Sequence, residues 1–284
     1  MSQKSSDLSP AMTAELTHLP ETPSLPPSNL IYDDGVPLES NRHRIAMNVL
    51  IASTHAALMP RQDYFTGGNM FVYYSTRQAR NQGFRGPDFF VTLNVDGSKE
   101  RKYWAIWEED GRYPDVIVEL MSPSTATIDR QDKKHLYADT FRTREYFIYD
   151  PFDPDSLQGW RLGEQGYREL TKNERGWLWC ETLGLWLGLW QGEIFRETTP
   201  WLRFYDGQGH LVLLPEEQEW QRAEQAEQAL NQERQRAEQA EQALNQERQT
   251  RLAAVSRLLS LGLTVNQVAA ALDLTVADVE QVQA

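Results

Sequence analysis

Cysteine is nearly absent from this sequence: Cys180 is its one representative among 284 residues. A disulfide framework and a cysteine-rich zinc site are therefore excluded, and a cytoplasmic location is favoured. Long apolar runs are lacking too, since none approaches the roughly 20 residues that a membrane-spanning helix needs. The N-terminal region mixes acidic residues with Ser, Thr and Pro and has no apolar core of a signal peptide. We therefore expect no membrane association.

Positive charge is also scarce, with 28 Lys and Arg against 41 Asp and Glu and a formal net charge of −13. Non-specific affinity for nucleic acid comes from Lys and Arg that neutralise phosphates, so this balance argues against a general nucleic-acid coat protein. It does not exclude a nuclease, because an acidic site attracts DNA once it has bound a metal ion.

Four segments differ in composition and predict four structural parts. Residues 1–28 are rich in Ser, Thr and Pro, which predicts a disordered arm. Residues 29–215 alternate apolar runs with Gly and Pro, which is typical of one packed α/β domain. Residues 216–250 form a heptad-repeat helix, and residues 251–284 a small tail of short helices.

The stretch from Pro114 to Lys133 carries the strongest functional signal. Its β-branched run, 116–118, predicts a buried strand, and Asp115 and Glu119 share one face of that strand. A buried carboxylate is costly unless a cation or hydrogen-bond donors compensate it. A polar helix follows with three residues on one face: Asp129, Lys133 and Tyr137. An acid that faces a lysine in this way can hold a divalent metal ion and a phosphate.

The remaining pattern predicts a mixed sheet with flanking helices. A helix is expected over 38–58, and a strand, a helix and a strand around 116–148 predict a crossover unit. Gly67-Gly68 predicts a tight turn between two strands. Further expected strands are 89–93, 104–107, an antiparallel run over 159–190, and a hairpin over 201–212. The tryptophans of the antiparallel run could form a base-stacking platform, but the leucines between them favour a core.

The C-terminal third leaves two alternatives open. Gln221–Arg234 is repeated unchanged at Gln235–Arg248, so Ala and Leu recur at heptad spacing. This pattern fits a weak coiled coil that joins copies of the chain, or a solvated single helix. The tail resembles a helix-turn-helix unit, but its last helix, 276–284, has no Lys or Arg. A docking or oligomerisation module is therefore favoured over direct DNA reading.

An ordered set of motifs between Glu39 and Pro151 resembles the Uma-two family of restriction endonucleases, in the Pro-Asp-(Asp/Glu)-x-Lys nuclease superfamily. The matching motifs are Glu39-Ser40-Asn41-Arg42-His43, Gly67-Gly68-Asn69-Met70-Phe71, Arg85-Gly86-Pro87-Asp88, Pro114-Asp115 through Glu119, Ser122-Pro123-Ser124-Thr125, Asp129-Arg130 with Lys133 and Tyr137, and Glu145-Tyr146 before Asp150-Pro151. The resemblance implies a restriction-endonuclease-like core with a mixed central sheet.

The same resemblance implies roles for particular residues. Asp88 and Glu119 correspond to the two metal-binding acids. The superfamily lysine is expected two residues after the second acid, where this chain has Met121. The family places a lysine on the following helix, so Lys133 is expected to replace it. Lys134 points about 100° away around that helix and is the weaker candidate.

Two further acids are possible auxiliaries: Glu39, which could reach the site from the first helix, and Asp115, which is either a third ligand or a cap of its strand. The implied activity is Mg²⁺-dependent hydrolysis of DNA phosphodiester bonds, with Mn²⁺ as a substitute metal. The alternative is a non-catalytic binding or assembly protein on a nuclease fold, acting through the coiled-coil segment and the tail. A toxin-like or transposon-linked nuclease is a third, weaker reading.

Overall fold

Strand β5 (Val116–Leu120) lies in the interior of the larger sheet, and all five of its residues are buried. The computed structural model describes residues 26–27, 29–32, 40–80, 85–122 and 129–283. The predicted N-terminal arm therefore lies almost entirely outside the described residues, and so does Glu39.

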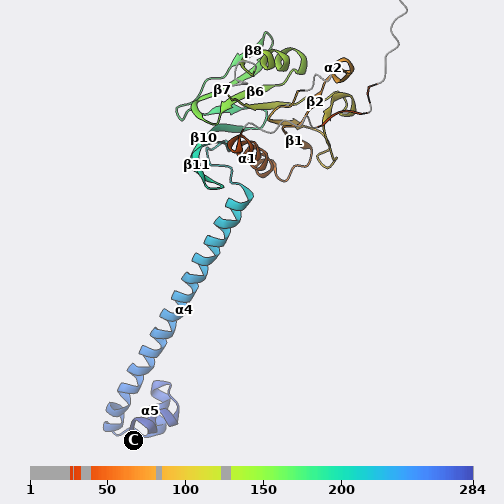
Figure 1. Ribbon diagram of the computed structural model, residues 1–284. Coiled ribbons are helices and arrows are strands. Elements are labelled where there is room, and N and C mark those ends of the chain that lie inside the picture. The colour runs from red at the N-terminus through yellow and green to blue at the C-terminus, as the bar shows by residue number, and fades with distance from the viewer. Residues whose placement is uncertain (1–25, 28, 33–39, 81–84, 123–128, 284) are drawn as a thin grey trace, which may run out of the picture. The chain divides into compact units, whose positions relative to one another are not determined.

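The larger sheet has six strands in the order β1-β3-β5-β6-β7-β8. Its other members are β1 (Tyr64–Gly68), β3 (Phe89–Leu93), β6 (Glu145–Asp150), β7 (Asp153–Gly163) and β8 (Gly166–Glu169). Strands β5 and β6 are parallel, and every other neighbouring pair is antiparallel (Figure 1). The predicted mixed sheet, with a crossover between β5 and β6, is therefore confirmed.

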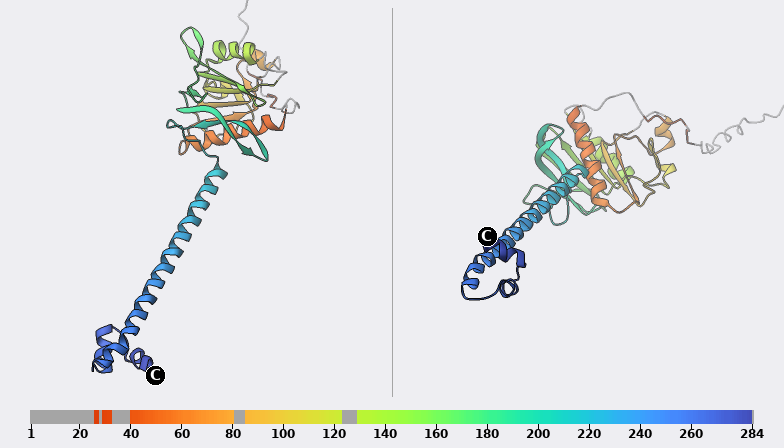
Figure 2. Two further views of the ribbon diagram at one scale, coloured as in Figure 1. Left: turned by 90° about the vertical axis from the view of Figure 1, so that its left-hand side faces the viewer. Right: turned by 90° about the horizontal axis from the view of Figure 1, so that it is seen from below.

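One face of this sheet packs against helix α1 (Asn41–Leu58) and a second, antiparallel sheet. The second sheet has the order β11-β10-β9, with bounds Glu197–Tyr205, Leu185–Ile194 and Leu178–Cys180. Figure 2 shows α1 in orange beside the blue-green strands of this sheet, and α1 contacts β11. The antiparallel run expected over 159–190 is thus divided between two sheets. Apolar side chains of both sheets and of α1 form one core.

The opposite face of the sheet is covered by two helical turns, η2 (Asp129–Lys133) and η3 (Leu136–Phe141). Both are π-helical, and they connect β5 to β6. Tyr137 and Phe141 pack there against Ile117 of β5 and Ile148 of β6 in a second core. Helical cover on both faces gives the α/β class that the sequence predicted.

The predicted tight turn at Gly67-Gly68 is wrong. Both glycines belong to β1, where Gly67 pairs with Phe90 and Gly68 with Phe89. A Cβ atom on Gly67 would lie 2.2 Å from Cε1 of the Phe90 ring, so the glycine admits this ring rather than a turn. Strand β2 (Val72–Tyr73) pairs instead with β4 (Trp104–Ala105), in a separate two-stranded parallel sheet. Beyond β4, the strand expected over 104–107 gives way to a 3₁₀ turn, Ile106–Glu108.

The last hairpin of the domain also differs from expectation. Strand β11 pairs along its length with β10, and the reversal between them is made by Phe195 and Arg196, both with positive φ. Such a turn usually uses Asn or Gly, so the sequence carried no signal for it. The predicted partner segment after Asp206-Gly207 forms a single bridge, from Tyr205 to Leu211.

The chain divides into two compact units, Met1–Pro215 and Glu216–Ala284. The second unit contains most of α4 (Pro215–Ser260), with α5 (Val265–Leu272) and α6 (Val276–Gln283). Thr264 and Gln267 form a capping box at the start of α5. A small core of Val255, Val268, Ala269 and Val279 holds the tail together. Among the described helices, none has an apolar stretch long enough to span a membrane.

Candidate active site

Strand pairing brings the two predicted acids together. Phe89 of β3 pairs with Val118 of β5 in an antiparallel register, so Asp88 lies opposite Glu119. The Asp88 amide donates to Glu119 Oε2 at 3.4 Å, and the Leu120 amide donates to Asp88 Oδ2 at 2.8 Å. Backbone amides therefore hold the two carboxylates close to each other.

Glu119 is fully buried, and each of its carboxylate oxygens has a partner from the helical cover. The Tyr137 hydroxyl donates to Oε1 at 2.7 Å, and Lys133 Nζ lies 2.9 Å from Oε2. The Lys133 side chain is 18% exposed. The i, i+4 relation predicted for these two residues holds although the turns are π-helical rather than α-helical. π-helical turns are frequent at functional sites.

The neighbouring lysine points elsewhere. Lys134 Nζ lies 4.0 Å from the centroid of the Trp160 ring, and burial lowers the pKa of Lys134. Met121, at the position of the superfamily lysine, is buried in the second core with Ile117. Among Met121, Lys133 and Lys134, Lys133 is therefore the residue whose ammonium reaches the acid pair.

Asp88 and Glu119 form a pair of carboxylates whose mutual repulsion is only partly offset by the positive charge of Lys133. Burial raises the pKa of Asp88 well above its usual range, the nearby Glu119 charge raises it further, and Lys133 opposes both effects. The raised pKa means that ionising both carboxylates is unfavourable in the folded protein. An additional positive charge at this point would relieve that cost.

Of the two auxiliary acids, the structure describes only Asp115, and its contacts lie away from the acid pair. Asp115 Oδ2 accepts from the Leu93 amide at 2.8 Å, and Oδ1 lies 3.4 Å from Arg144 Nε. Four residues along a strand separate it from Glu119 by roughly 13 Å. Of the two roles considered for Asp115, its contacts fit the strand cap. Glu39 lies outside the described residues.

Two further residues make contacts at the site that the sequence did not predict. The sequence pattern puts Tyr137 on the helix face of Lys133 but indicates no role for it. His43, near the start of α1, is buried, and its Nε2 donates to the Met121 carbonyl at 3.1 Å. Ser40 Oγ lies 2.8 Å from Nδ1 of the same ring. Because a carbonyl can only accept, Nε2 of His43 carries a proton. The signal for His43 was its place in the first matching motif.

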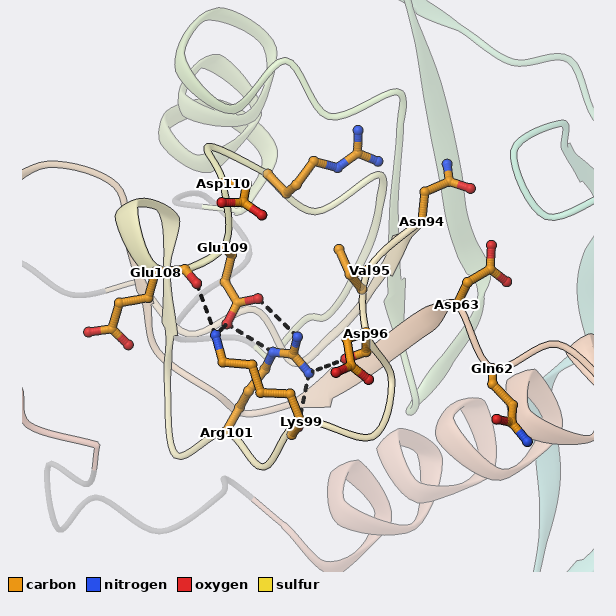
Figure 3. A pocket seen from close by; sticks show the side chains of 11 residues that line it. Gln62, Asp63, Asn94, Val95, Asp96, Lys99, Arg101, Glu108, Glu109 and Asp110 are labelled. Atoms are coloured by element: carbon orange, nitrogen blue, oxygen red, sulfur yellow. Dashed lines mark hydrogen bonds and ion pairs between the residues drawn. The ribbon is translucent and has the colours of Figure 1, made fainter.

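A large pocket of about 850 Å³ lies at the other end of β3. Asn94 lines the pocket at that end. Asn94 lies six residues along the chain from Asp88, and six residues of a strand span roughly 20 Å. Figure 3 shows Lys99 and Arg101 converging on Glu109 in this pocket. Arg101 binds the two Glu109 oxygens at 3.0 and 2.9 Å, and its side chain is 2% exposed. Lys99 and Arg101 are thus both held by the single carboxylate of Glu109 in an ion-pair cluster.

Comparison with known proteins identifies the family of the chain. The Uma2 family model, described as "Putative restriction endonuclease", matches residues 14–194. A solved structure titled as a "putative nuclease belonging to DUF820" from Anabaena variabilis ATCC 29413 is 12% identical, with a TM-score of 0.38, and the match covers 52% of this chain and 76% of the other. No curated protein sequence matches the chain significantly. Because the family model spans well over half of the sequence, the chain belongs to the Uma2 family.

Proposed function

We propose that this protein is a metal-dependent endonuclease that hydrolyses phosphodiester bonds of DNA, with Asp88, Glu119 and Lys133 as its catalytic residues. The observation that carries the proposal is the meeting of two carboxylates from neighbouring strands beside an ammonium group, 2.9 Å from Glu119, that comes from the crossover segment. This is the constellation that the family resemblance implies, with Lys133 in place of a lysine at position 121.

The donor set fits Mg²⁺, with Mn²⁺ as a substitute. Asp88 and Glu119 offer hard oxygen ligands, and the raised pKa of Asp88 reflects a site that favours added positive charge. Among the described residues no group of three or more His, Cys, Asp and Glu side chains could hold a metal ion. Two protein carboxylates nevertheless suffice for Mg²⁺, which usually keeps several waters and takes further oxygens from substrate phosphates.

Each residue of the site has its own role in the proposed reaction. When bound, the metal supplies a bound water of lowered pKa and stabilises the charge that develops on the phosphate. Asp88 and Glu119 hold the metal, and Lys133 orients the attacking water or neutralises the phosphate. Tyr137 fixes the Glu119 carboxylate by its 2.7 Å hydrogen bond. The Leu120 amide does the same for Asp88.

Cleavage of supercoiled plasmid and of labelled oligonucleotides tests the proposal. We expect cleavage in Mg²⁺ or Mn²⁺, no cleavage in EDTA, and loss of cleavage in Asp88→Asn and Glu119→Gln. The matched control is Asp115→Asn, which removes a carboxylate immediately before β5 and should cleave like wild type if Asp115 only caps the strand. Circular dichroism confirms that each variant is folded. Wild type that cleaves neither DNA nor RNA with either metal would refute the proposal.

The second candidate function is a non-catalytic assembly protein on this nuclease fold. Two observations favour it: Met121 occupies the usual lysine position, and Leu230 and Leu244 on the heptad face of α4 are 49% and 68% exposed. In either case we propose that residues 216–250 join copies of the chain. We also propose a cytoplasmic location, because the one cysteine, Cys180, is a free buried thiol.

A further inference from the structure

Helix α4 presents a long apolar seam to solvent. Every residue from 221 to 250 is exposed, and the seam leucines, Leu230 and Leu244, are 49% and 68% exposed. The tail contacts only the C-terminal end of the helix, where Arg248 forms a 2.8 Å ion pair with Asp278. The seam consists of the apolar a and d positions of the heptad: Ala223, Ala226, Leu230, Ala237, Ala240 and Leu244.

Two acids beside the seam have no basic neighbour on their own helix. A solvated single helix is stabilised by opposite charges that lie three or four residues apart. Glu227 and Glu241 occupy e positions of the heptad, next to the seam, and neither has a Lys or Arg at those spacings. Each instead has a second glutamate three residues before it, Glu224 and Glu238. The charge pattern of this stretch is therefore not the one that stabilises an isolated helix.

We propose that two copies of the chain pair through this seam in a parallel, in-register coiled coil. In such a pair each g residue faces the e residue that lies five positions later in the other copy. Arg222 then faces Glu227 of the second copy, and Arg236 faces Glu241. By symmetry each contact occurs twice, and each leucine of the seam packs on its own counterpart. The second copy thus supplies the bases that the two acids lack.

An antiparallel pair cannot satisfy the leucines and the charges together. In that arrangement e residues face e residues, and g residues face g residues. The register that packs Leu230 on an alanine of the other copy brings Glu227 opposite Glu241 and Arg236 opposite its own counterpart. A shift by one heptad aligns opposite charges, but it places Leu230 opposite Glu247. Charge complementarity therefore selects the parallel pair.

The seam also contains a residue that opposes pairing. Glu233 occupies a d position, so in the parallel pair it meets its own counterpart. Arg234, at the next e position, flanks this contact and offsets part of the repulsion. A polar residue at a seam position lowers stability but specifies the register. The pair is therefore expected to be reversible and to have one alignment.

The direction of pairing has a consequence for the rest of the chain. Residues 1–215 precede α4 in each copy, so parallel pairing joins two copies of that domain at the same end of the helix pair. The inference specifies the assembly role proposed for residues 216–250, and it does not depend on nuclease activity.

Disulfide trapping in the full chain tests the direction and the register. The natural cysteine, Cys180, is fully buried, so an introduced cysteine is the reactive thiol. We expect Ala226→Cys and Ala240→Cys each to form a disulfide-linked dimer on mild oxidation, because in a parallel pair a d residue faces its counterpart. The matched control is Gln228→Cys, on the outer face of the same turn, which should remain unlinked.

The pattern of linked dimers discriminates between the arrangements. An antiparallel pair can bring a residue against its own counterpart at only one point along the helix, so the two variants, 14 residues apart, cannot both be linked in it. Disulfides that form only when the two variants are mixed would show an antiparallel or staggered pair. Linking no greater than that of Gln228→Cys would show that the seam is not paired. Either result would overturn the inference.

A charge swap measured by sedimentation equilibrium supplies the second test. Arg236→Glu places like charges at both symmetric contacts, so we expect the dissociation constant to rise about tenfold. Adding Glu241→Arg to this variant should restore the wild-type value. The control is Gln235→Glu with Gln242→Glu, which makes the same change in net charge on the outer face and should have little effect. Circular dichroism checks that helicity is kept.

The possible results of the swap have separate meanings. A dissociation constant that does not respond to Arg236→Glu, or that the second substitution does not restore, would overturn the proposed contact between g and e residues. Metal-dependent cleavage is measured separately, so failure of the pairing would leave the nuclease proposal standing.

Discussion

The hydrogen bond from Tyr137 to Glu119 allows a quantitative test of how the site is built. Both residues have 0% exposure, and the hydroxyl donates to Glu119 Oε1 at 2.7 Å. Tyr137→Phe keeps the ring and leaves one carboxylate oxygen buried without this donor. Hydrogen bonds to charged groups contribute about 1.5–3 kcal/mol, so we expect the free energy of unfolding to fall by about 2 kcal/mol. At about 2–4 °C per kcal/mol for a domain of this size, Tm should fall by about 4–8 °C.

Tyr149→Phe is the matched control for this substitution. Tyr149 is 1% exposed, and its hydroxyl donates to the neutral Pro200 carbonyl at 2.9 Å. A hydrogen bond to a neutral acceptor contributes about 1 kcal/mol, so this variant should lose about half as much stability. Urea denaturation of wild type and both variants, followed by tryptophan fluorescence and circular dichroism, measures the difference. If Tyr137→Phe costs no more than Tyr149→Phe, Glu119 is not a buried ionised acceptor and the electrostatic account of the site is wrong.

Three further predictions concern charge and assembly. Burial and the Glu119 charge raise the pKa of Asp88, so without metal the contribution of Asp88 to the stability of wild type should fall as the pH rises from about 4, the pKa of Asp in an unfolded chain, through the raised value. Asp88→Asn should therefore raise Tm at neutral pH but not at pH 3, and a variant less stable than wild type at neutral pH would contradict this sign. Lys133→Met should slow cleavage about 100-fold or more, whereas Lys134→Met should cleave close to the wild-type rate, and equal rates for the two would remove Lys133 from the site. Light scattering should give a larger oligomer for the full chain than for residues 1–215, and an unchanged oligomeric state would exclude α4 as the joining segment.

Local pattern determined much of the fold. The β-branched run of β5, the cap at Ser40 that begins α1, and the crossover before β6 were all predictable, because strand burial, helix capping and chain connectivity are encoded within a few residues. The heptad period likewise identified α4. Its exposed Leu and Ala do not distinguish a solvated helix from one that pairs with a second copy, since that choice depends on another chain.

Contacts between distant residues required the tertiary structure. Gly67 carries a turn signal in sequence, but the ring of Phe90, a residue of the neighbouring strand, is what requires a glycine there. Phe195 and Arg196 make a hairpin turn without any turn signal, because pairing along β10 and β11 imposes their positive φ.

The candidate site shows the same division between what local sequence predicts and what tertiary structure decides. The sequence by itself determined that Asp88, Glu119 and Lys133 belong to one recognisable pattern, because residue types and their spacings can be read from the sequence alone. Only the tertiary structure decided that Asp88 lies opposite Glu119, that Lys133 and Tyr137 take the two oxygens of Glu119, and that Asp115 is bound elsewhere. The physical reason is that strand register and the direction of a side chain are set by packing across the sheet, which no short stretch of sequence contains.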